Sequence, residues 1–96
     1  MNLTPARFQR KAARAEAAIR RAREAVTTAP VVGYRLGLMA PADLDRILVN
    51  VGTLVALGAW TAENDANLAR EFTDRERAAL YAAVLAHIVP ALLEEP

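Results

Sequence analysis

The sequence predicts a small all-α protein: a bundle of three helices, or four if a short connecting helix forms, with an extended apolar linker between the first two. Apolar residues recur at helical spacing in three separate segments, and each segment begins with residues that favour a helix start. Only one short stretch, in the linker, alternates as a strand would. The 96 residues are expected to form a single domain.

The first helix is predicted over about residues 5–27. Thr4 can cap free backbone N–H groups, and Pro5 stands where its missing N–H costs nothing. Apolar residues then recur at alternating steps of four and three, a heptad pattern typical of a packing seam. This seam consists of Phe8, Ala12, Ala15, Ile19, Ala22 and Val26. Because half of these residues are Ala, we expect a partner helix to approach closely.

Residues 28–40 are predicted to form the linker, because Pro30, Gly33 and Gly37 interrupt any helix. Large apolar side chains alternate in it with Gly or Arg, a pattern typical of an extended segment with one apolar face. That face consists of Val32, Tyr34, Leu36 and Leu38. It either folds over the core of its own chain or docks on another subunit, and we predict that these four residues contribute to an oligomer interface.

The second helix is predicted over about residues 41–60 or longer. Pro41 suits the first turn of a helix, where the helix dipole also favours Asp43. Residues 47–62 include no charge, and apolar side chains point almost all the way round, so a nearly buried position is expected. A stripe of small residues, predicted to lie at an oligomer interface, consists of Gly52, Ala56 and Ala59. The polar segment 61–72 either extends this helix or forms a short helical connection.

The third helix is predicted over about residues 74–89. Thr73 and Glu76 have the spacing of a capping box ahead of an apolar run. Pro90 cannot donate a hydrogen bond to the Ala86 carbonyl, so the helix is expected to kink or end there. Its Ala-rich face is too apolar for an ordinary solvent side, and we predict that Ala82 and Ala86 contact another subunit.

Charge is divided unevenly along the chain. The first thirty residues carry seven basic and two acidic side chains, a net of +5, whereas the rest carry five basic and nine acidic, a net of −4. On a helical wheel, five basic residues form one strip beside the apolar seam. This basic strip consists of Arg7, Arg10, Lys11, Arg14 and Arg21.

Three interpretations of the basic strip are open. It binds an acidic protein surface, it contacts nucleic-acid phosphates without reading bases, or it pairs with acids of its own chain or of a sister subunit. The acids considered for internal pairing are Glu63, Asp65, Glu71, Asp74 and Glu76.

Few residues could support catalysis or bind a metal. The chain has no Cys and no Ser, which excludes disulfides, Cys metal sites, and Ser or Cys nucleophiles. His87 is the only imidazole, and no carboxylate lies three or four residues from it, so a local metal site lacks convergent ligands. No Gly-rich phosphate loop occurs. We therefore predict no enzymatic activity, no catalytic residues, no metal and no cofactor.

Two uncharged stretches, residues 47–62 and 78–93, bear on membrane insertion. Each would be about 24 Å long as a helix, whereas the hydrocarbon core of a bilayer is about 30 Å thick. A membrane location is therefore not favoured. No uncharged apolar run follows the basic N-terminal residues directly, so no secretory signal is expected. The predicted location is cytoplasmic, or the virion if the protein is phage-encoded.

Composition favours self-association, because 22 residues are Ala and only five are aromatic, which makes the core of one chain thin. Eleven Arg against one Lys indicates a GC-rich gene, such as that of a bacterium or its phage. We expect a non-enzymatic helical assembly or adaptor protein, a homo-oligomer whose basic strip engages an acidic protein surface. The alternatives are a sequence-nonspecific nucleic-acid-binding protein and a small two-span, holin-like membrane protein.

Overall fold

The computed structural model describes residues 5–30 and 36–94, and side chains for residues 12–30 and 36–94. Within these ranges the chain consists of helices joined by turns and short irregular segments, without strands, which confirms the predicted all-α bundle. The helices, in chain order, are α1 (Pro5–Thr27), α3 (Pro41–Ala56), α4 (Ala62–Ala69), α5 (Asp74–Ala83), the π-helical turn η1 (Val84–Ile88) and α6 (Val89–Leu93).

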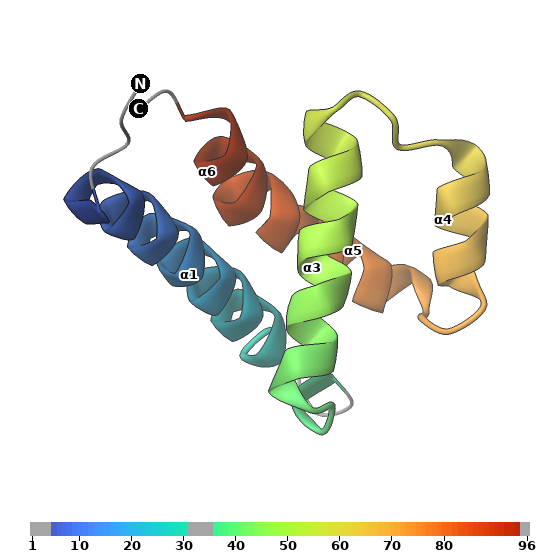
Figure 1. The fold of residues 1–96 in the computed structure, drawn as a ribbon. Coiled ribbons are helices and arrows are strands. Elements are labelled where there is room, and N and C mark those ends of the chain that lie inside the picture. Colours follow the sequence, from blue (N-terminus) through green and yellow to red (C-terminus); the bar gives the residue numbers. More distant parts are fainter. Residues whose placement is uncertain (1–4, 31–35, 95–96) are drawn as a thin grey trace.

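The last three elements form one continuous C-terminal helix over residues 74–93. Figure 1 shows α1 running roughly antiparallel to this helix, with α3 crossing it and α4 standing to one side. Both α1 and α3 contact η1, and they also contact each other. The core therefore lies where α1, α3 and the C-terminal helix meet.

The side chains buried at this meeting point come from α1, α3, α5 and η1 and from Leu36 and Phe72, whereas α4 and α6 contribute none. The largest that are fully buried are Val26, Leu36, Leu44, Leu48, Leu80 and Val84. On α3, burial is confined to one stripe that includes Leu48 and Val51, while Asn50 and Thr53 are exposed. The expectation that this helix is nearly buried is therefore wrong, because no helix of the described residues packs on its other faces.

The buried face of α1 differs from the predicted seam. Ala18, Ala22 and Val26 are buried and Ile19 is partly buried, whereas Ala12 is exposed. Ala15 is exposed as well. Figure 1 shows that α1 and α3 diverge from the point where α1 ends, so the first turns of α1 lie away from α3. The side chain of Phe8 lies outside the described residues. Of the other seam residues, the prediction is correct for Ile19, Ala22 and Val26 and wrong for Ala12 and Ala15.

Helix α3 ends four residues before the predicted position because of Gly58. The N–H of Gly58 donates to the Val55 carbonyl at 3.0 Å, and the N–H of Ala59 donates to the Leu54 carbonyl at 2.8 Å. Gly58 has a φ of 70°, in the left-handed region that glycine adopts without strain. This is a Schellman motif, which closes a helix by using its free carbonyl groups.

The polar segment after α3 forms the short connecting helix α4, so the four-helix alternative is the correct one. A capping box between Thr61 and Asn64 begins it: the Thr61 hydroxyl accepts from the Asn64 N–H at 3.2 Å, and Asn64 Oδ1 accepts from the Thr61 N–H at 2.9 Å. The predicted capping box of Thr73 and Glu76 at the start of α5 is confirmed, with the same reciprocal bonds at 3.2 and 2.8 Å.

The C-terminal helix continues past Pro90 to Leu93, beyond its predicted end at residue 89. Just before the proline the helix widens into η1, where the Val89 N–H bonds to the Val84 carbonyl, five residues back. Pro90 then lies in the first turn of α6, where its missing N–H is tolerated. The π-turn is thus the local change that lets the helix continue through the proline.

The linker does not present the single extended apolar face that was predicted. Val32 and Tyr34 lie outside the described residues, and Leu36 and Gly37 are helical. Leu36 is 0% exposed in the core, while Leu38 is 72% exposed. On an extended strand, residues two positions apart, such as Leu36 and Leu38, would lie on the same face. The helical turn therefore separates them, and this end of the linker folds over the core of its own chain.

Candidate functional site

Two residues of the basic strip, Arg14 and Arg21, have described side chains, and both are exposed. They are seven residues apart, which places them on one face of α1 two turns from each other. The structure brings them to the edge of α1 that faces the C-terminal helix. The side chains of Arg7, Arg10 and Lys11 lie outside the described residues, although their backbone belongs to α1.

Arg14 and Arg21 line a groove between α1 and the C-terminal helix, which we call the α1–α6 groove. It has a volume of about 570 Å³. Its lining consists of Arg14, Arg21, Ala86, His87, Pro90, Ala91, Leu93 and Glu94. The side chains of Arg14, Arg21 and His87 thus lie beside a mainly apolar wall formed by Ala, Pro and Leu residues. One carboxylate, that of Glu94, lies among them.

The carboxylate in the groove belongs to Glu94. Arg14 Nη1 donates to Glu94 Oε1 at 3.4 Å, and both side chains are about half exposed. An exposed pair of this kind is typically worth only about 0–1 kcal/mol, so it can exchange with solvent or with another anion. Arg21 has no ion-pair partner within the described part of the chain.

Sequence reasoning did not find Glu94, which was absent from the acids considered as internal partners of the strip. Asp65 and Asp74 instead pair with Arg77, and Glu76 caps its own helix. The topology of the bundle explains the Arg14–Glu94 pair, because the last residues of an antiparallel C-terminal helix lie beside the beginning of α1. His87, the only imidazole of the chain, lies half-buried in this groove.

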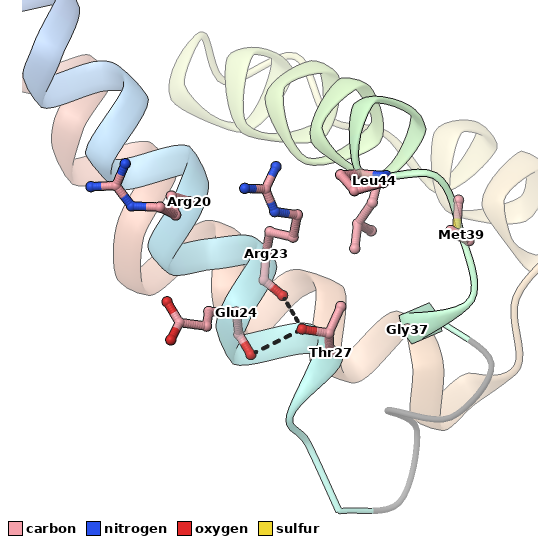
Figure 2. A pocket seen from close by; sticks show the side chains of 8 residues that line it. Arg20, Arg23, Glu24, Thr27, Gly37, Met39 and Leu44 are labelled. Carbon is pink, nitrogen blue, oxygen red and sulfur yellow. Dashed lines mark hydrogen bonds between the residues drawn. The ribbon is translucent and has the colours of Figure 1, made fainter.

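A second pocket, of about 380 Å³, lies between the C-terminal half of α1 and the start of α3. Figure 2 shows the Arg23 side chain extending from α1 toward α3. There Arg23 Nη1 donates to Asp45 Oδ2 at 2.5 Å, and Glu24 also lines the pocket. Thr27 also lines the pocket, and its hydroxyl donates to the Arg23 carbonyl of its own helix at 3.0 Å. The lining also includes Arg20, and Asp45, which lies outside the lining, already pairs with Arg23. This pocket is therefore the weaker anion site.

The predicted interface residues fall into two groups. Leu38, Ala59, Ala82 and Ala86 are exposed, and Ala56 is partly exposed. Leu36 and Gly52 are buried within the chain, so their assignment to an oligomer interface is wrong. A close helix approach does occur at Gly52, but the partner is Ile88 of the same chain: a Cβ on Gly52 would lie 2.2 Å from Ile88 Cγ2.

An apolar groove of about 430 Å³ lies between the end of α3 and the C-terminal helix. It is lined by Val55, Gly58, Trp60, Tyr81, Val84 and Leu85. The rings of Trp60 and Tyr81 meet edge to face, with centroids 5.8 Å apart and an interplanar angle of 76°. The Tyr81 hydroxyl donates to Asp65 of α4, which also lies 3.4 Å from Arg77 Nε. These contacts attach α4 to α5 at the border of the groove.

Burial of the Tyr81 phenol, reinforced by the neighbouring Asp65 carboxylate, raises the pKa of Tyr81 to about 12. Because this pKa exceeds the ordinary value of 10.0, the unfolded chain releases the proton first, and stability is expected to fall as the pH rises from about 10 to 12.

Ultraviolet titration of the phenol in a Tyr34→Phe background isolates Tyr81. Asp65→Asn is expected to lower the Tyr81 pKa, whereas Asp43→Asn should leave it unchanged. An ordinary tyrosine titration in the parent would contradict the Tyr81–Asp65 contact.

Within the described ranges no group of three or more His, Asp or Glu side chains is arranged to hold a metal ion. One helix there, residues 74–93, is long and apolar enough to cross a bilayer, a criterion that the core helix of a soluble protein can also meet. Neither the protein-family models, nor the curated proteins, nor the solved structures include a match to this chain.

Proposed function

We propose that this chain is a non-enzymatic helical assembly protein that self-associates through the outer face of its C-terminal helix and binds an acidic partner through the basic strip. The observation that carries self-association is that this outer face is both exposed and uncharged. It consists of Ala78, Ala82 and Leu85, with Ala86 at its border with the α1–α6 groove. An ordinary solvent face of a helix carries charged or polar side chains.

The outer face continues into the apolar groove beside it. Leu85 is 58% exposed and belongs to both surfaces. Leu57, which precedes the lining residue Gly58 in the sequence, is 73% exposed. Small Ala side chains next to a groove with aromatic walls suit the close approach of a helix from a second copy. Contiguous exposed apolar surface of this kind is typical of protein–protein contacts.

Binding of an acidic partner is supported by the exposed half of α1. Residues 12–16 are all exposed, so the chain leaves both the strip residue Arg14 and its apolar neighbours accessible. The abundance of Arg over Lys supports a bacterial or phage component, located in the cytoplasm or in a virion. In such an assembly the outer face would join copies while the basic strip recruits the acidic partner.

Ala82→Glu is expected to dissociate the assembly, because it places a charge in an apolar helix contact. Light scattering after size exclusion should show the wild-type chain above its monomer mass of 10.4 kDa at high micromolar concentration, and the variant close to it. Ala66→Glu, at an exposed position of α4, is the matched control and should leave the mass unchanged.

Two results would contradict the proposed assembly. A wild-type chain that is monomeric at high micromolar concentration would leave the outer face without a partner copy. A chain that remains dispersed only in detergent would instead support the membrane alternative, in which the same helix contacts lipid.

A further inference from the structure

We infer that the α1–α6 groove is the binding site for an acidic, partly apolar peptide segment of the partner, and that Glu94 competes with that segment for Arg14. This inference rests on the proposed function, since it names the place and chemistry of the acidic-partner contact. It also adds a regulatory element, because a group of the chain itself occupies part of the site.

The charges in the groove favour a ligand with more than one carboxylate. Arg14 and Arg21 stand two turns apart on α1, and only Arg14 has an acidic partner among the described residues. A guanidinium presents several N–H donors in a fixed planar arrangement that matches a carboxylate. The Arg14–Glu94 contact shows that a carboxylate can reach this wall of the groove, and Arg21 offers a second position.

The rest of the lining favours a peptide over nucleic acid. Ala86, Pro90, Ala91 and Leu93 provide an apolar wall against which aliphatic side chains can pack. The lining includes no Trp, Tyr or Phe on which bases could stack. An acidic segment with interspersed aliphatic residues satisfies both the basic side and the apolar side.

Glu94 is suited to act as a weak internal competitor. Its contact with Arg14 is 3.4 Å long and half exposed, so an incoming carboxylate can displace it at small cost. Neutralising Glu94 should therefore strengthen binding of the acidic segment. If Glu94 merely supported the shape of the groove, neutralising it would weaken binding. The sign of this one change separates competition from support.

The probe is a fluorescent twelve-residue peptide with three Leu-Ala-Glu-Glu repeats, and its control is the same peptide with Gln in place of Glu. Anisotropy titration of the full chain should show binding of the acidic peptide and not of the Gln peptide. Glu94→Gln is expected to raise the affinity about two- to fivefold. Combining Arg14→Gln with Arg21→Gln is expected to lower it about tenfold or more. Arg75→Gln and Glu63→Gln change the same charges at exposed positions elsewhere, and they should leave the affinity within about twofold.

The outcomes separate the inference from the proposed function. Equal or weaker binding by Glu94→Gln overturns the competition. A second double variant combines Arg7→Gln with Arg10→Gln. If this variant loses binding while the variant at Arg14 and Arg21 binds like wild type, the basic strip still binds the acidic partner but the groove is the wrong site. If no variant and no wild-type chain binds the acidic peptide, the acidic-partner part of the proposed function fails. A 20-base-pair duplex DNA that binds through Arg14 and Arg21 and outcompetes the peptide would replace the peptide with nucleic acid and overturn the inference.

Discussion

Leu80→Ala is expected to lower the free energy of unfolding by about 2–5 kcal/mol, the usual cost of removing a buried leucine side chain. Leu80 is 0% exposed and belongs to the cluster that joins α1, α3 and the C-terminal helix. The space it leaves cannot collapse easily, because three helices border it. A domain of this length is typically stable by about 5–15 kcal/mol, so the loss should lower the melting temperature by about 8 °C or more.

Leu92→Ala is the control for this measurement. It removes the same atoms from the same continuous helix at a residue that is 48% exposed, so its cost should be well below that of Leu80→Ala. Thermal and urea unfolding should be followed at a concentration where the chain is a single species, since association adds apparent stability. Equal losses for the two variants would show that the helix does not pack through Leu80.

Gly52→Ala is expected to destabilise the protein by about 1–3 kcal/mol, although alanine is the better helix former by about 1 kcal/mol. The added Cβ would lie 2.2 Å from Ile88 Cγ2 and 3.0 Å from Ile88 Cβ. Ile88 is buried, and a β-branched side chain in a helix has one strongly preferred rotamer, so it cannot turn away cheaply. Helices α3 and η1 would have to separate, and urea unfolding measures the resulting loss.

A matched glycine and a second-site change make the test specific. Gly37→Ala adds the same atom at an exposed position with nothing within 4 Å, and it should be neutral or stabilising. Ile88→Ala removes the clashing Cγ2, so in the Ile88→Ala background the cost of Gly52→Ala should shrink or change sign. If Gly52→Ala stabilises the chain as much as Gly37→Ala does, the close contact between Gly52 of α3 and Ile88 of η1 is contradicted.

The candidate site shows why sequence reasoning identified some of its residues and missed others. Arg14 and Arg21 were predictable as strip members, because helical periodicity alone places residues seven apart on one face. Glu94 and His87 come from the other end of the chain, and no periodicity within one helix relates them to α1. Leu36 and Gly52 were assigned to a second subunit because sequence shows that a residue is apolar or small, but it does not show which helix meets it.

The sequence by itself determined the all-α class, the capping box of Thr73 and Glu76 and the starts of the main helices, because these depend on hydrogen bonds and backbone preferences among residues a few positions apart. Only the tertiary structure decided that α1 is buried along Ala18 and Ala22 but exposed near Ala12, and that Gly52 meets Ile88. The same holds for the groove that joins Arg14 to Glu94, eighty positions away. Such contacts depend on how far each helix extends past its neighbours and at what angle they cross, which is the combined result of packing across the whole core.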